Sequence, residues 1–288
     1  MPFPGFALGS GRGSMSQIRL LSMDFDGTLV RNWAPPPYPK KLVQILNELR
    51  DQGVLLAINT GRTIRLVEEA LDVTGFPVRP DFALTSEREV FRWTGSTWED
   101  FGGWNSRCRD EHDTLFANCE ALLQQIEQHL ESATAARLHY EENRFSGLVS
   151  STNAEMDEIC QFLEGKRFEF PDFAYQRNSI YLRFCHSAYH KGTALGELQR
   201  LTDISKEETF AVGDNFNDLP MLSLDYAHFL ACPSNALEDV KITVRDQGGF
   251  VASEDSGLGV YEALRHFFPT SVKKKSFWGR LSEGHRGF

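Results

Sequence analysis

The chain has no long apolar run, few cysteines and a deficit of positive charge, and each of these excludes a class of protein. No segment approaches the roughly 20 consecutive apolar residues that a membrane-spanning helix needs, so we expect no membrane partner. The five cysteines show no CxxC spacing and cannot all pair, which favours reduced thiols in the cytoplasm over a disulfide framework. The formal net charge of -10 argues against nucleic-acid partners, because phosphate backbones attract basic surfaces.

Length and composition favour two structural units. The chain has 288 residues, and 41% of them are hydrophobic, enough for a packed core with a second module. Residues 1–16 lack the cationic start and apolar stretch of a secretory signal, and we expect them to be disordered, with Met15 as an alternative start. Residues 271–288 form a basic tail, which we interpret as solvated rather than as a docking element.

The most informative segment carries two carboxylates directly after the apolar run Ile18 to Leu21. It reads Met-Asp-Phe-Asp-Gly-Thr over residues 23–28, which places Asp24 and Asp26 two positions apart. An apolar run that ends in a glycine turn predicts a buried parallel strand, which delivers its acids to the ligand-binding edge of an open α/β sheet. One carboxylate can then attack phosphorus while the other exchanges a proton, and such a pair favours Mg²⁺ as its cation. The alternative is an ordinary strand-end Asp-Gly turn.

A second apolar strand, at residues 55–59, ends in groups that can bind an anion. Thr60, Gly61 and Arg62 follow it, and the sequence from Thr63 to Leu71 predicts a helix. Amides at a helix amino terminus, together with the Thr60 hydroxyl, can hold phosphate oxygens. Thr60 as a plain helix cap is the alternative.

Lys191 supplies a cation at the start of another predicted helix, at residues 193–201. The helix dipole opposes a positive charge at this end, so the lysine requires an anion nearby. Taken alone, a solvated surface lysine is the alternative interpretation.

A third strand, at residues 209–212, leads into a turn that is dense in oxygen ligands. Asp214 and Asp218 lie four positions apart, so a helical turn would place them on one face, where they could share a hard cation with the acids of the first strand. Helix capping by Asp214 or Asn215 is the alternative.

Together, in this order and each at a predicted strand end, the four segments resemble the motifs of the haloacid dehalogenase superfamily of phosphatases. The resemblance rests on DxDGT at residues 24–28, Thr-Gly-Arg at 60–62, Lys191 and GDxxND at 213–218. A long insertion between the second and third motifs stands where the family has its type-two cap, so the resemblance is closest to the Cof-type and sucrose-phosphatase-like branch. It covers residues 17 to 268 and implies a doubly wound α/β core with a parallel, Rossmann-like sheet and an inserted α+β cap.

The resemblance also implies a role for each matching residue. Asp24 is the nucleophile that forms an aspartyl-phosphate, and Asp26 is the general acid and base. Mg²⁺ is expected between Asp24, the main-chain carbonyl of Asp26 and Asp214, with Asp218 nearby. The residues expected around the phosphoryl group and its ester are Thr60, Gly61, Arg62, Lys191 and Asn217.

The insertion predicts a cap built from a repeated helix and hairpin, with the core at residues 17–88 and 187–270 and the cap at residues 89–186. The predicted cap elements are a helix at 113–130, strands at 137–141 and 145–150, a helix at 154–163, and strands at 173–176 and 179–184 that turn at Arg177-Asn178. Alternation along the last strand places Tyr181 and Arg183 on one face, and we expect these two to meet substrate. The alternative is an exposed polar face that contacts nothing.

The implied function is Mg²⁺-dependent hydrolysis of a small phosphate monoester, with a sugar phosphate as the leading substrate by analogy. A phosphomutase of the same superfamily and a non-catalytic phospho-ligand-binding regulator are the alternatives. The presence of Asp26 speaks against the regulator, because mere binding does not require a proton-transfer acid. One departure is that the family's Asn-Gly pair is replaced within Thr85–Glu89, so the contacts of that pair are not carried over. The sequence does not specify an oligomeric state.

Overall fold

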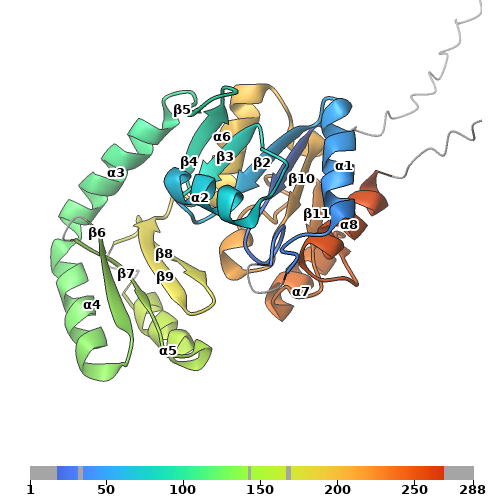
Figure 1. The fold of residues 1–288 in the computed structure, drawn as a ribbon. Helices are drawn as coiled ribbons and strands as arrows, with labels where there is room; N and C mark the ends of the chain where they lie inside the picture. The colour runs from blue at the N-terminus through green and yellow to red at the C-terminus, as the bar shows by residue number, and fades with distance from the viewer. Residues whose placement is uncertain (1–17, 32–34, 142–143, 167–169, 269–288) are drawn as a thin grey trace, which may run out of the picture.

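A computed structural model describes residues 18–31, 35–141, 144–166 and 170–268, which build two β-sheets (Figure 1). The expected amino-terminal segment and the basic tail lie outside these residues. In the larger sheet the strands from β12 to β3 run parallel, β4 is antiparallel to β3, and β5 is antiparallel to β4. The spatial order of its eight strands is β12 (Phe250–Val251), β11 (Phe229–Cys232), β10 (Thr209–Val212), β1 (Leu20–Met23), β2 (Leu55–Asn59), β3 (Phe82–Thr85), β4 (Glu89–Trp93) and β5 (Trp98–Asp100).

Helices cover both faces of this sheet, which confirms the predicted doubly wound α/β core. One face packs against α1 (Lys40–Asp51), α2 (Ile64–Thr74) and α8 (Ser256–Phe267), and the other against α6 (Lys191–Thr202) and α7 (Glu238–Asp246). Side chains of a strand alternate between the two faces of the sheet. In β1, Leu21 and Met23 pack on the face covered by α1, α2 and α8, and Leu20 packs on the face covered by α6 and α7. Among the described residues no helix has the length and apolar character needed to cross a membrane.

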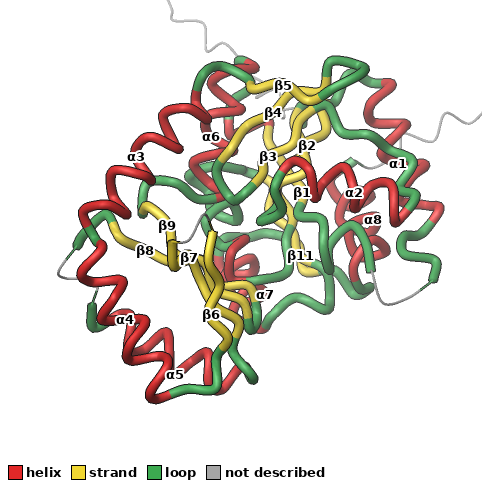
Figure 2. The backbone as a smooth tube through the Cα atoms, turned by 60° about the vertical axis from the view of Figure 1, so that its left-hand side comes forward, coloured by secondary structure: helices red, strands yellow, loops and turns green. Residues whose placement is uncertain are grey.

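A four-stranded antiparallel sheet forms the second unit (Figure 2). Its apolar face packs against the helices, through side chains such as Ile126, Ile159 and Phe184. Helix followed by hairpin occurs twice, as the sequence predicts. The strands, in spatial order, are β6 (Arg137–Glu141), β7 (Arg144–Val149), β9 (Tyr181–His186) and β8 (Phe173–Asn178), and the helices are α3 (Trp104–Asn118), α4 (Glu120–Ala133) and α5 (Asn153–Glu164).

Three details of this unit differ from the sequence prediction. The predicted helix at 113–130 is two helices, α3 and α4, which meet at Cys119. The last hairpin turns at Ser179-Ile180 instead of Arg177-Asn178, because β8 continues to Asn178 and Ser179 adopts a left-handed φ of 53°. Residues 89–100, expected in the cap, instead form β4 and β5 and extend the large sheet. We propose that the cap begins after this pair, near the glycines at 102 and 103.

The alternation predicted for the last strand agrees with the structure. Leu182 and Phe184 are buried in the apolar layer under the small sheet. Tyr181, 58% exposed, and Arg183 project from the opposite face. The small sheet therefore presents a polar face opposite the layer that holds it together.

The contact between β7 and β9 yields a stability prediction. A Cβ at Gly147 would lie 2.3 Å from the Leu182 carbonyl oxygen, so Gly147→Ala must push two paired strands apart. We expect it to lower the free energy of unfolding by about 2 kcal/mol or more, measured by chemical denaturation. The matched control is Gly165→Ala, where φ is -64° and the change should stay below about 1 kcal/mol. Equal effects of the two substitutions would contradict the prediction.

Candidate active site

The carboxyl ends of three adjacent parallel strands bring the predicted site residues together. Strand β1 lies between β10 and β2, so the turns that follow these strands meet at one edge of the sheet. The backbone N–H of Asp24 donates to the Val212 carbonyl oxygen at 3.0 Å, which joins the turn after β1 to the end of β10. The strand order reverses at β1, because β2 and β3 follow on one side of it and β10, β11 and β12 on the other. Open α/β sheets bind ligands at such a point.

Lys191 is fully buried at the start of α6 and bridges two carboxylates. Its Nζ donates to Asp24 Oδ1 at 2.8 Å and to Asp218 Oδ1 at 2.6 Å. Burial alone would lower the pKa of Lys191, but the charges of Asp218 and Asp24 outweigh burial and hold the pKa well above its ordinary value. The lysine is therefore charged, and the solvated-surface alternative is wrong.

The positive charge of Lys191 does not balance the negative charges of Asp24, Asp214 and Asp218. Burial raises the pKa of Asp24 well above its ordinary value, and repulsion from Asp218 and Asp214 adds to the rise while Lys191 opposes it. Burial and the charge of Asp218 likewise raise the pKa of Asp214 to about 7. Three acids around one ammonium leave excess negative charge, which a bound cation would relieve.

The donor atoms of the cluster fit a hard divalent cation. Asp24, Asp214 and Asp218 each offer a carboxylate oxygen, and these oxygens lie within 4.8 Å of one another. Oxygen-only donors suit Mg²⁺ or Ca²⁺ rather than a softer metal. Asp214 is further positioned by Thr28, whose Oγ1 donates to Asp214 Oδ1 at 2.8 Å.

Asp218 organises the turn between Gly213 and the short helix η3 (Phe216–Asp218). Its Oδ2 accepts from the backbone N–H groups of Asp214 and Asn215, at 2.8 and 2.9 Å, while Oδ1 is bound to Lys191. Asn215, not Asp214, caps η3, because the Asn215 side chain accepts from the Phe216 N–H. Asp218 thus holds both the ammonium and the backbone that carries Asp214.

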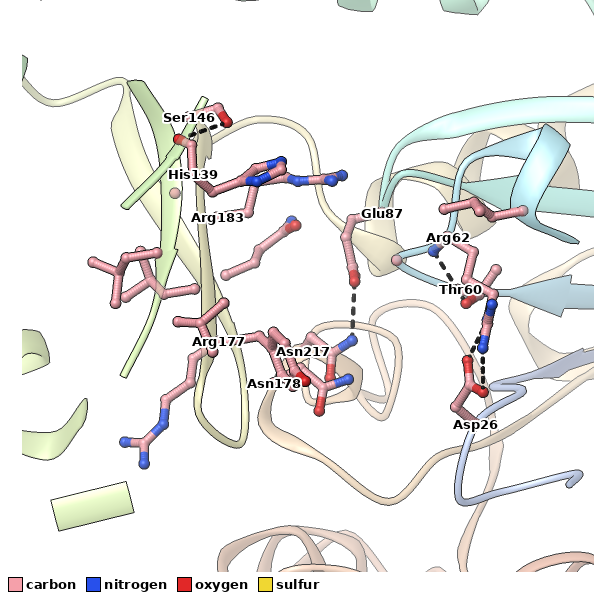
Figure 3. Close-up of a pocket in the computed structure, with 18 of the residues that line it drawn as sticks. Asp26, Thr60, Arg62, Glu87, His139, Ser146, Arg177, Asn178, Arg183 and Asn217 are labelled. Carbon is pink, nitrogen blue, oxygen red and sulfur yellow. Dashed lines mark hydrogen bonds and ion pairs between the residues drawn. The ribbon is translucent and has the colours of Figure 1, made fainter. Parts of the chain in front are cut away.

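Asp26 is held by Arg62 in a two-point contact that the sequence did not reveal. Arg62 Nε donates to one Asp26 oxygen at 2.6 Å and Nη2 to the other at 2.8 Å (Figure 3). A planar guanidinium fixes the orientation of a carboxylate in this geometry. Arg62, expected to contact substrate, therefore orients Asp26 in this structure, and both side chains line the cavity described below.

The turn after β2 leaves Thr60 available for a role other than helix capping. Thr63 is the N-cap residue of α2, three positions further on. The Thr60 hydroxyl accepts from the Arg62 N–H at 3.3 Å and is buried beside the cavity. Thr60 and Gly61 thus form a compact turn at the edge of the sheet, as an anion site requires.

A cavity of about 760 Å³ lies between this edge and the polar face of the small sheet. The volume suits a small metabolite. Figure 3 shows the Arg183 and His139 side chains reaching from the cap toward the core, and the core residues on the opposite side. Lys191 contacts Asp24 directly, Asp218 is linked to Asp24 through Lys191, and Asp214 lies in the same acidic cluster. The other predicted residues line the cavity itself: Asp24, Asp26, Thr60, Gly61, Arg62, Tyr181, Arg183 and Asn217.

Glu87 is the main functional candidate that sequence reasoning missed. It lies in the cavity wall two positions after β3, is 6% exposed, and accepts at Oε1 from Asn217 Nδ2 at 2.9 Å. The available signal was an acid after an apolar strand, the same signal that identified Asp24. The other cavity-lining side chains with polar groups that were not predicted are His139, Ser146, Gln176, Arg177 and Asn178.

Comparison with known proteins gives consistent matches. The family model described as haloacid dehalogenase-like hydrolase matches residues 21–81 and 111–264. A phosphoglycolate phosphatase of Nitrosopumilus maritimus is 23% identical over 87% of this chain and 96% of its own length. Another, of Thermoplasma volcanium, is 29% identical over 36% of this chain and 47% of its own length. The sucrose-phosphatase of Synechocystis, solved with sucrose and phosphate, is 18% identical with a TM-score of 0.64 over 87% of this chain and 98% of that chain.

The raised pKa of Asp214 predicts a pH-dependent cation affinity. A carboxylate must lose its proton to bind a cation, so the Mg²⁺ affinity should fall several-fold between about pH 8 and about pH 6, measured by titration calorimetry. The control is Thr28→Val, which removes a hydrogen bond that lowers the Asp214 pKa and should move the fall to higher pH. An affinity that does not change over this range would contradict the prediction.

Proposed function

Because the chain belongs to the haloacid dehalogenase-like hydrolases, we propose that it is a Mg²⁺-dependent phosphatase that hydrolyses a small phosphate monoester, with a sugar phosphate as substrate. One observation carries the proposal: the buried Lys191 ammonium holds the Asp24 carboxylate at 2.8 Å beside the Thr60-Gly61 turn and at the wall of a cavity. A nucleophile, a countercharge and an anion-binding turn then meet at one point.

In the proposed reaction an Asp24 oxygen attacks phosphorus and forms an aspartyl-phosphate, while Asp26 donates a proton to the departing ester oxygen. Asp26 then takes a proton from water, whose oxygen attacks the phosphorus, releases inorganic phosphate and restores Asp24. Thr60 and the Gly61 amide hold the phosphoryl oxygens, and Lys191 offsets negative charge. The Asp24 and Asp214 carboxylates and the Asp26 carbonyl, with Asp218 nearby, would hold Mg²⁺, which would supply further charge neutralisation.

In the proposed reaction Arg62 positions the Asp26 carboxylate. Its two hydrogen bonds keep the Asp26 carboxylate at the cavity wall, at the start of the turn that follows Asp24. A proton-transfer group must lie within hydrogen-bond reach of the ester oxygen, and the Arg62 contact keeps Asp26 at that place. Both Asp26 oxygens accept from Arg62, so one of these hydrogen bonds must open when Asp26 donates its proton to the ester oxygen. A protein that only bound phosphorylated ligands would not need this arrangement.

The substrate class rests on the cavity and on the relatives. The cavity is large enough for a sugar phosphate, and the cap face offers Tyr181, Arg183 and Gln176 for hydroxyl groups. The sucrose-phosphatase supports a sugar ester, whereas the two phosphoglycolate phosphatases support a smaller acid ester. We propose a cytoplasmic protein with a small phosphorylated metabolite as its partner. A phosphomutase is the second candidate within the same chemistry.

One prediction of this reaction scheme concerns Asp24 and Asp26, the two acids of the turn after β1. Asp24→Asn should abolish phosphate release from a panel of sugar phosphates, because it removes the nucleophile, and Asp26→Asn should lower kcat by about 10²–10⁴-fold. Chelation with EDTA should abolish release from the unchanged protein, and added Mg²⁺ should restore it. The control is Asp51→Asn, an exposed acid at the end of α1 whose loss should leave the rate unchanged. Full activity of Asp24→Asn would exclude this nucleophile.

Product analysis separates hydrolysis from phosphoryl transfer within the same assay. A phosphatase releases one inorganic phosphate for each ester consumed, whereas a mutase returns an isomeric ester. Ester isomerised without phosphate release would replace the phosphatase proposal with the mutase.

The cap residue Arg183 supplies a second prediction. Its guanidinium lines the cavity and is 3.1 Å from Glu141, so Arg183→Ala should change KM across the sugar phosphates while p-nitrophenyl phosphate is affected less. The measurement is steady-state kinetics on both kinds of substrate. Unchanged constants across the panel would remove Arg183 from the substrate site.

A further inference from the structure

The end of β3 and the segment that follows it are tied to the turn at Thr60–Arg62 by three backbone hydrogen bonds. Thr60 N–H donates to the Leu84 carbonyl at 2.8 Å, Ser86 N–H to the Arg62 carbonyl at 2.8 Å, and Glu87 N–H to the Thr60 carbonyl at 3.2 Å. The base of the Glu87 side chain is therefore fixed beside Thr60 and Arg62. These hydrogen bonds hold the backbone of Glu87 in place, so its side chain does not extend from a loose loop.

The backbone that carries Glu87 is strained. Ser86 and Glu87 have φ values of 51° and 66°, which glycine adopts freely but which L-residues other than asparagine and aspartate seldom adopt. Both residues lie in the segment Thr85–Glu89, where the chain lacks the Asn-Gly pair of the haloacid dehalogenase family. Strain of this kind clusters at functional sites, where the surrounding structure enforces it.

The Glu87 carboxylate occupies space that Gly61 leaves open. A Cβ at Gly61 would lie 2.6 Å from Glu87 Oε1, so a larger residue at 61 would displace the acid. In Figure 3 the Glu87 side chain extends from the core wall between the Thr60–Arg62 turn and the cap residues, with its carboxylate toward Asn217. The acid thus stands beside the place proposed for the phosphoryl group.

Two hydrogen-bond acceptors in this wall have no partner among the described residues. Asn217 Nδ2 donates to Glu87 Oε1, which leaves Glu87 Oε2 and Asn217 Oδ1 buried and unpaired. A buried acceptor without a donor is unfavourable, so both atoms are suited to a ligand that brings donors. Burial raises the pKa of Glu87, while Lys191, Asn217 and Arg183 oppose that rise.

We propose that Glu87 is a specificity-determining residue that accepts a hydrogen bond from a hydroxyl group near the phosphoester and excludes esters that carry a carboxylate there. This inference rests on the proposed phosphatase site, whose substrate class it narrows. A hydroxyl supplies the donor that Oε2 and Asn217 Oδ1 lack. A carboxylate supplies none and repels the buried acid, and like charges brought together in a desolvated site are strongly unfavourable.

The test compares two ligands that differ only in this group. Ethylene glycol monophosphate carries CH₂OH where phosphoglycolate carries a carboxylate. Binding of each is measured by calorimetry with Mg²⁺ in an Asp24→Asn background, which prevents turnover of a bound ester. Glu87→Gln is the isosteric variant that removes the charge, and Glu87→Asn is a second variant whose residue type tolerates a positive φ. Glu89→Gln, an acid that pairs with Arg109 away from the cavity, is the matched control.

The Asp24→Asn protein should bind the hydroxyl ester at least about tenfold more tightly than phosphoglycolate. Both Glu87 variants should reduce that preference by at least about tenfold, mainly through tighter phosphoglycolate binding, and Glu89→Gln should leave it unchanged. An unchanged preference in folded Glu87 variants, or an equal change in Glu89→Gln, would overturn the inference. A separate assay of p-nitrophenyl phosphate hydrolysis with Asp24 intact tests the proposed function alone, because the binding comparison does not depend on turnover.

Discussion

The site is organised by one buried ammonium ion. Lys191 has no exposed surface, so its charge is tolerable only because Asp24 and Asp218 accept its hydrogen bonds at 2.8 and 2.6 Å. Removing one partner of such a buried pair typically costs about 3–5 kcal/mol. The lysine begins α6, Asp24 follows β1 and Asp218 ends η3, so this one contact fixes three separate elements against each other. The turn after β10 must close tightly, because Asp218 also holds the backbone N–H groups of Asp214 and Asn215.

The remaining charges follow from that arrangement. Burial raises the pKa of Asp24 and Asp214, and repulsion among acids that one ammonium cannot balance adds to the rise. The same excess of negative charge underlies the affinity that we propose for Mg²⁺. The cap is placed over the same charges: Ser179 N–H at the tip of the β8–β9 hairpin donates to Asn215 Oδ1 at 3.2 Å. A cap that contacts the turn carrying Asp214 can exclude water from the proposed phosphoryl site and present selective side chains to an ester bound there.

The sequence was sufficient for the parts of the protein that depend on local pattern. Apolar runs followed by acids identified the strand ends at Asp24 and Asp214, and burial confirmed the alternation that places Tyr181 opposite Leu182. Long-range contacts were not readable in the same way. The pairing of Arg62 with Asp26 joins residues that are 36 positions apart, and no periodicity encodes it. Residues 89–100 were assigned to the cap because strand pattern does not specify a pairing partner, and Glu87 was passed over because its importance depends on packing against Gly61 and Asn217.

The account depends most directly on covalent chemistry at Asp24. The deciding measurement is acid quenching of the enzyme during turnover of a phosphate ester, followed by peptide mass spectrometry to locate bound phosphate. The account predicts a phosphorylated peptide that contains Asp24, with the modification on that residue and lost on mild base treatment, as expected of an acyl phosphate. Turnover with no phosphorylated peptide, or with phosphate on a different residue, would contradict it.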